Sequence, residues 1–143
     1  MPPSSVAHST VTGRFEPAVV HVTVTGAAEP LEIETFGIPP GGNPRAIFAT
    51  GWAIDRRASS GPGVTAIQAW AYPAGAAAPI FLGSAQMPFE RADIAAIYGS
   101  RYRDSGWTLG GTLPSGSYQI VFFARSAATG QFDNVRVRSL IVP

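Results

Sequence analysis

The sequence of 143 residues contains no cysteine, and all ten of its basic residues are arginine. Without cysteine the chain cannot form a disulfide framework, a thiolate nucleophile or a cysteine-ligated zinc site. Charge of either sign is sparse, because charged residues make up 13% of the sequence and the net charge is +1. A chain with so little net charge has no field that attracts nucleic acid or an anionic membrane surface, so we expect neither as a partner.

Long apolar runs are also missing. No segment approaches the roughly 18 consecutive apolar residues that a membrane-spanning helix requires. Residues 1–5 (MPPSS) carry neither the basic nor the apolar region of a signal peptide. We therefore expect no membrane insertion, and a chain that is cytoplasmic, a mature form or a piece of a longer protein. The length fits one domain, and a hydrophobic content of 45% excludes intrinsic disorder.

Turn-forming residues recur along the whole sequence, which has 16 glycines and 13 prolines. Between the turns lie short runs of β-branched and aromatic residues, in which apolar and polar positions alternate as they do in half-buried strands. About seven strands with a turn every 8–12 residues or so are typical of a β-sandwich, and the sequence therefore predicts an all-β fold. The predicted strands are residues 31–35, 46–54, 64–72, 80–85, 107–109, 117–124 and 135–142.

One segment, residues 91–98, is predicted to be helical. Asp93 lies near the positive end of this segment, and Gly99 ends it. Two to three turns are too few to form a layer of the fold, so the sequence predicts a short crossover helix between the two sheets.

The two ends of the chain resemble each other. Residues 7–16 align without a gap with residues 124–133, and the alignment continues more weakly with Val20 on Val137 and Val24 on Ile141. The alternative is a chance likeness between two hairpins that share turn residues. We favour a duplication, because similarity at the spacing of a domain marks a tandem array. Identical residues in the two copies are Ala7 and Ala124, Ser9 and Ser126, Thr12 and Thr129, Gly13 and Gly130, and Phe15 and Phe132.

The duplication predicts three parts of the chain. Residues 1–26 would be the terminal hairpin of a preceding repeat, residues 27–30 a linker, and residues 31–143 one complete sandwich repeat. A lone hairpin is marginally stable in water, so residues 1–26 need to dock on their own domain or on the sheet edge of another chain. The alternating residues Val20, Val22 and Val24 form a candidate strand-addition segment. Through it the chain would form a homo-oligomer or a filament by strand exchange.

Short motifs follow one another in a fixed order through the complete repeat: residues 51–55 (GWAID), 63–73 (GVTAIQAWAYP), 81–85 (FLGSA), 91–99 (RADIAAIYG), 105–107 (SGW), 113–118 (LPSGSY) and 124–132 (ARSAATGQF). In this order they resemble the immunoglobulin-like (Ig-like) repeats found in tandem, often near the C-termini, in large secreted or surface proteins of bacteria. The resemblance covers residues 31–143 together with the N-terminal segment that aligns with the end of the chain. Such repeats usually carry proline between the arginine and the aspartate of the helix motif, where this chain has Ala92.

The resemblance implies an Ig-like β-sandwich that acts as a non-catalytic structural, adhesive or spacer module. It implies a location outside the cell or at the cell surface, within a longer secreted protein whose neighbouring repeats are the partners. The family carries no established catalytic residues that could be transferred to this sequence, and it implies no cofactor.

Histidine is too scarce to support a shared catalytic mechanism. His8 and His21 are the only two histidines, and both lie in the partial repeat. Their counterparts in the complete repeat are Arg125 and Arg138, so neither histidine is expected to be an essential base. A Ser-His nucleophile is therefore not expected in the complete repeat.

Carboxylates offer a second route to catalysis. Asp55, Asp93, Asp104 and Asp133 could in principle meet in pairs, and two acids flanking a sugar bond would suit glycoside hydrolysis. Each lies beside arginine or in a turn, however, and ion pairs or capping hydrogen bonds explain them more simply. We expect no enzyme, no catalytic residue, no metal site and no cofactor. Calcium at a repeat junction stays an open alternative, although no Asp-x-Asp-x-Asp loop occurs.

Aromatic side chains give the alternative function of a carbohydrate-binding module. Tyr72, Tyr102 and Trp107 could stack on the sugar rings of a glycan, and Tyr72 and Tyr102 are the best candidates for exposure. Trp52 and Trp70 lie within central predicted strands, where a tryptophan packed against the opposing sheet is usual. We therefore expect these two rings in the core.

Overall fold

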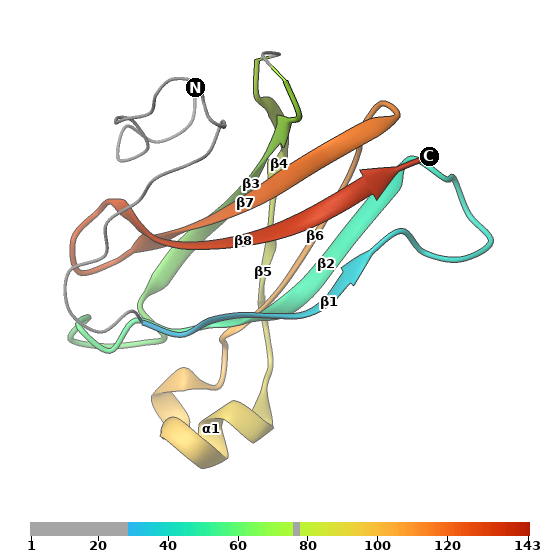
Figure 1. Cartoon of the computed structure of the whole chain (residues 1–143). Helices are drawn as coiled ribbons and strands as arrows, with labels where there is room; N and C mark the ends of the chain where they lie inside the picture. Colours follow the sequence, from blue (N-terminus) through green and yellow to red (C-terminus); the bar gives the residue numbers. More distant parts are fainter. Residues whose placement is uncertain (1–28, 76–77) are drawn as a thin grey trace.

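The computed structural model describes residues 29–75 and 78–143 (Figure 1). These residues form two antiparallel four-stranded sheets that face each other, which confirms the predicted all-β sandwich. One short helix, α1 (Ala92–Tyr98), and one 3-10 turn, η1 (Ser100–Tyr102), complete the fold. The strands are β1 (Leu31–Gly37), β2 (Ala46–Ala53), β3 (Val64–Pro73), β4 (Ile80–Ser84), β5 (Gln86–Phe89), β6 (Gly106–Thr112), β7 (Gly116–Ser126) and β8 (Phe132–Val142).

The strand order is that of an immunoglobulin-type sandwich. One sheet, which we call sheet A, has the order β1-β2-β6-β5, and the other, sheet B, has the order β4-β3-β7-β8. With the strands lettered along the chain, these orders correspond to ABED facing CFG, with β4 as an additional edge strand beside strand C. The seven predicted strands all occur. The eighth, β5, was not predicted because it has only four residues and contains Pro88.

Helix α1 lies where the sequence predicts it, and Gly99, with φ of 121°, follows its last residue. The predicted crossover between sheets is wrong, however. The helix connects β5 to β6, which are adjacent strands of sheet A. Ile94 is buried against Ile54 and Tyr102, with Trp52 beside them, and this small cluster fixes the helix to the end of sheet A.

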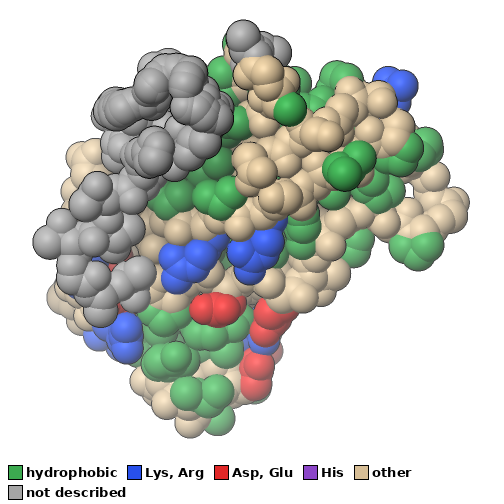
Figure 2. Space-filling model, in the orientation of Figure 1, with side chains coloured by type: hydrophobic (Ala, Val, Ile, Leu, Met, Phe, Trp, Pro, Cys, Tyr) green, Lys and Arg blue, Asp and Glu red, His purple; other side chains and the backbone are tan. Residues whose placement is uncertain are grey.

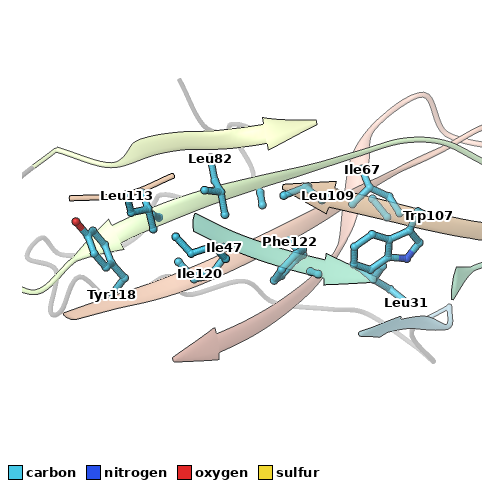
Figure 3. Packing of buried hydrophobic residues seen from close by; sticks show 14 of the residues in the cluster. Leu31, Ile47, Ile67, Leu82, Trp107, Leu109, Leu113, Tyr118, Ile120 and Phe122 are labelled. Carbon is cyan, nitrogen blue, oxygen red and sulfur yellow. The ribbon is translucent and has the colours of Figure 1, made fainter. Parts of the chain in front are cut away.

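The main core lies between the sheets, and its two largest fully buried side chains are the rings of Trp107 on β6 and Phe122 on β7 (Figure 3). Their centroids lie 5.8 Å apart. The inward residues of β2 and β3 are small at several positions, such as Ala49, Ala69 and Ala71, and this leaves room for the two rings.

Trp52 and Trp70, which we expected in the core, point away from it. Side chains alternate across a strand, and the buried neighbours Ala53 and Ala69 occupy the inward positions. The inward tryptophan is instead Trp107, which lies beside Gly51. A Cβ on Gly51 would collide with the backbone of β1 and would lie 3.1 Å from the Trp107 ring.

A tyrosine corner closes the turn between β6 and β7. Tyr118, near the start of β7, is buried, and its hydroxyl donates to the carbonyl oxygen of Pro114 at 2.7 Å. A tyrosine that bonds back to the chain a few residues upstream of this strand is a hallmark of immunoglobulin-type sandwiches.

The four edge strands each carry a feature that disfavours pairing with a further strand. The strands β4 and β5 are short, and the register of β1 shifts between Ile33 and Thr35. The long edge strand β8 carries Arg136 and Arg138 on its inward side, and these guanidinium groups donate to backbone carbonyl oxygens of β8 itself. Figure 2 shows basic and acidic side chains between the two sheets, on the side where β8 and β1 form the edges.

Candidate functional site

Several loops meet at the end of the sandwich where β1 and β8 begin. We call this region the linker end, and it consists of residues 29–30, the β2–β3 loop (residues 54–63) and the β7–β8 turn (residues 127–131). Asp55, one of the four aspartates that the sequence singled out, lies in the β2–β3 loop, and Asp133 follows the β7–β8 turn. The linker end is therefore the strongest candidate for a functional site among the described residues.

Glu29, the first described residue, is held on both its side chain and its backbone. Its carboxylate accepts hydrogen bonds from the backbone nitrogen of Arg56 at 2.7 Å and from the Nε of Arg56 at 3.0 Å. Its carbonyl oxygen accepts from the Nδ2 of the buried Asn134 at 2.5 Å. The hydrogen bond with Glu29 raises the pKa of the Arg56 guanidinium. These bonds fix the direction in which the chain enters β1.

Arg57 bridges two carboxylates at the linker end. Its guanidinium donates to Asp55 at 2.9 and 2.5 Å, and to Asp133 at 3.1 and 3.4 Å. Burial of Asp55 acts to raise the pKa of its carboxyl, but hydrogen bonds from Arg57 and Ser126 outweigh it and hold the pKa below its usual value. Both acids are therefore paired with a cation, and the bridge joins the β2–β3 loop to the beginning of β8.

The β7–β8 turn explains the motif that the two ends of the chain share. The Oγ of Ser126 accepts from the backbone nitrogens of Ala128 and Thr129, at 3.0 and 3.3 Å. The hydroxyl of Thr129 donates to Asp133 at 2.9 Å, and Gly130 takes a φ of 71°, which favours glycine. Each of these positions has its match in the N-terminal copy, where Ser9, Thr12, Gly13 and Glu16 occur at the same spacing. The shared residues are thus the ones that build the turn.

The expectation that ion pairs or turn hydrogen bonds account for the acids is confirmed for three of them, of which Asp133, bound by Arg57 and Thr129, is described above. Asp55 pairs with Arg57, and Asp93 pairs with Arg91 at 2.8 Å, which lowers the pKa of the Asp93 carboxyl. Arg103, which precedes Asp104, pairs with Glu90 instead. Within residues 29–75 and 78–143, no group of three or more histidine, aspartate or glutamate side chains is arranged to hold a metal ion.

Two of the three candidate sugar-stacking rings are buried, so the expected exposure of Tyr102 is wrong. Tyr102 is 6% exposed, because it packs with Ile54 and Ile94 beneath α1. Trp107 is 1% exposed and lies in the core. Neither ring has a free face for a sugar.

The third candidate, Tyr72, is half-buried on the outward face of β3. Its hydroxyl is buried and has no hydrogen-bond partner among the residues that the structure describes. Burial raises the pKa of Tyr72 to about 12. Of the three candidate rings, Tyr72 is thus the only one that is partly exposed to a glycan.

The remaining predictions fall on residues outside the described ones. Val20, Val22 and Val24, the hairpin of residues 1–26 and both histidines lie there, and so does the first half of the linker at residues 27–30. Strand addition through this segment stays a prediction.

Sequence reasoning missed the anchoring role of Asn134 and the contribution of Arg101. The guanidinium of Arg101 donates to the carbonyl oxygens of Ala58 at 2.7 Å and Gly61 at 3.1 Å, and so ties η1 to the β2–β3 loop. No local pattern marks either residue, because their partners lie 105 and about 40 positions away in the chain. In the sequence Asn134 stands on the same side of the strand as Arg136 and Arg138, so nothing there marks it as buried.

No protein-family model, curated protein or solved structure was found to match this chain. In the described parts of the chain no helix is long and apolar enough to cross a membrane.

Proposed function

We propose that the chain is a non-catalytic structural module, an Ig-like repeat that acts as a spacer in a longer secreted or cell-surface protein. In this role each repeat forms its own core, and the linker between repeats sets the direction in which one follows another. Adhesion by the parent protein would use the repeat to hold a binding region away from the cell surface.

The observation that carries the proposal is the position of the two ends of the described chain. Glu29 lies at the linker end, and β8 runs from that end to the C-terminus at the opposite end of the sandwich (Figure 1). Repeats of this form can follow one another end to end. The bonds from Arg56 and Asn134 to Glu29 would then hold the junction in one direction.

The terminal strands are also arranged to resist tension. The strand β8 pairs with β7 along its whole length, from Phe132 opposite Arg125 to Val142 opposite Gly116. Force applied at the two ends acts along β1 and along β8. Strand β1 must then slide along β2, and β8 along β7, so that many backbone hydrogen bonds bear the load at the same time. An applied force accelerates unfolding, and a shear geometry raises the barrier that the force must overcome.

Single-molecule force spectroscopy tests the proposal. Because the chain has no cysteine, Ala28→Cys and a cysteine added after Pro143 place handles on either side of residues 29–143. The matched control carries the second handle at Ser115→Cys instead of Ala28→Cys. Ser115 precedes the strand position that pairs with Val142, so this geometry peels β8 from β7 one residue pair at a time.

We expect the chain to unfold at a clearly higher force when pulled end to end than when peeled. Circular dichroism of both variants establishes that they fold alike before the comparison. An end-to-end force equal to or below the peeling force would contradict a role as a spacer under tension.

A further inference from the structure

The outward face of sheet B carries a row of apolar side chains, one from each strand. In register, Phe81 of β4 lies opposite Trp70 of β3, Trp70 opposite Val121 of β7, and Val121 opposite Val137 of β8. The rings of Trp70 and Phe81 lie 5.0 Å apart. Phe81 and Val137, at the two ends of the row, are 47% and 43% exposed.

A second group of apolar residues extends this row. Phe123 lies opposite Val135 in the neighbouring register position, and Ile141, farther along β8 on the same face, is 74% exposed. Val121 and Phe123 are completely buried, although they point away from the core between the sheets. No helix or strand within residues 29–75 and 78–143 packs across this face. An outward sheet face is ordinarily polar, so this one is suited to contact another apolar surface.

The segment of this chain that best matches the face is residues 18–25 (AVVHVTVT). Val20, Val22 and Val24 alternate there with His21, Thr23 and Thr25, as in a strand with one apolar side. In the alignment of the two ends, these valines fall on positions 137, 139 and 141. Those are outward positions of β8, two of which are the apolar Val137 and Ile141, so the sequence alternation of the segment matches that of β8.

The segment can reach the face. Its residues lie 4 to 11 positions before Glu29, which is bonded to Asn134 at the beginning of β8. An extended chain of that length spans about 13–36 Å, whereas three strand spacings across sheet B amount to about 14 Å.

The edge of sheet B is less suited than its outward face to bind residues 18–25. Arg136 and Arg138 lie along β8, which is the one long edge strand of the described sheets, and charged side chains on an edge disfavour a further strand. The outward face carries no such charge in the row from Phe81 to Val137.

We propose that the outward face of sheet B is a docking surface for the chain's own residues 18–25, with Val20, Val22 and Val24 packed against Trp70, Phe81 and Val137. The inference goes beyond the spacer function, because it holds whether or not the chain comes from a tandem array.

Disulfide trapping tests the contact directly, because the wild-type chain has no cysteine. Ser139 is exposed on the outward side of β8 and suits Ser139→Cys. This change is combined in turn with Val20→Cys, Val22→Cys and Val24→Cys in the full chain. The matched control pairs Val22→Cys with Thr112→Cys, an exposed position on the outward face of sheet A.

We expect at least one of the three Ser139 pairs to form an intramolecular disulfide at low protein concentration, as judged by mass spectrometry and non-reducing electrophoresis. The Thr112 control should remain reduced under the same conditions. Equal trapping in the control, no intramolecular disulfide in any pair, or disulfides only between two copies would each overturn the proposal.

A charge on the apolar side of the segment gives a second test. Val22→Asp should lower the thermal midpoint of the full chain by about 3 °C or more and should increase the binding of a hydrophobic dye. Thr23→Asp, on the opposite side of the same segment, should leave both unchanged. Equal effects of the two substitutions would contradict docking through the valine side.

Discussion

Tyr118 contributes one buried hydrogen bond that can be removed without changing the shape of the core. Tyr118→Phe deletes the hydroxyl that donates to the carbonyl oxygen of Pro114 at 2.7 Å and leaves the ring in place. We expect a loss of about 1 kcal/mol in the free energy of unfolding, measured by urea denaturation. Tyr98→Phe, at an exposed ring of α1, is the matched control and should change that free energy by less than about 0.5 kcal/mol. Equal losses in the two variants would mean that the hydrogen bond from Tyr118 to Pro114 does not stabilise the fold.

Asp55 makes the stability of the fold depend on pH. Its pKa in the folded chain lies below the usual value of 3.8, so the folded state releases this proton more readily than the unfolded state. The stabilisation is fully present above the usual value and is lost as the pH falls through the lower folded value.

Asp55→Asn should therefore cost about 1–3 kcal/mol at pH 7, because the charged hydrogen bonds with Arg57 are lost. The difference from the wild-type chain should shrink when urea denaturation is repeated at a pH below 3.8. Asp104→Asn, at an exposed acid, serves as the control and should change little at either pH. A cost for Asp55→Asn that is the same at both pH values would contradict the role of the charged form.

At the scale of the element, α1 offers two isoleucines in opposite environments. Ile94 is 3% exposed and packs on Ile54 and Tyr102, whereas Ile97 is 71% exposed. Ile94→Ala should lower the free energy of unfolding by about 2–4 kcal/mol through the lost burial and the cavity left behind. Ile97→Ala should change it by no more than about 0.5 kcal/mol. Chemical denaturation of both variants checks this, and equal losses would show that α1 is not held by its Ile94 side.

The sequence was sufficient to locate the helix and seven of the eight strands, because their ends are marked by turn residues and their alternation is regular. Which way a strand faces was harder to predict. The place of Trp52 and Trp70 within central strands favoured burial, but the inward positions on either side of each tryptophan hold alanine or glycine. The ring that occupies the resulting space, Trp107, comes from β6, which lies more than 50 residues after β2 in the chain. That complementarity depends on strand pairing and cannot be read from one segment.

The linker end was predictable only in part, for the same reason. Asp55 and Arg57 are neighbours in sequence, so their ion pair follows from local spacing. Asp133, the second acid bound by Arg57, lies 76 positions away and is brought there by the β7–β8 turn. The turn itself was predictable from its serine, threonine and glycine, because each makes a local hydrogen bond or takes a positive φ.

At the scale of the whole molecule, the two sheets share one main core, and consecutive strands repeatedly change sheet. Neither sheet can bury its inward face without the other. We therefore expect two-state unfolding, with urea transitions by tryptophan fluorescence and by far-ultraviolet circular dichroism that coincide. Trp107 in the core reports tertiary packing, and the strands dominate the dichroism. Separated transitions would mean that one sheet persists without its partner.

The protected edge strands of both sheets affect how copies of the chain behave at high protein concentration. A sheet with an open margin can merge with that of its neighbour, and repeated merging leads to fibrils. In this molecule the two short strands, the shifted register of β1 and the arginines of β8 stand against such merging on every margin of the described sheets. We expect these features to disfavour fibril formation through the sheet edges when copies are held at high density.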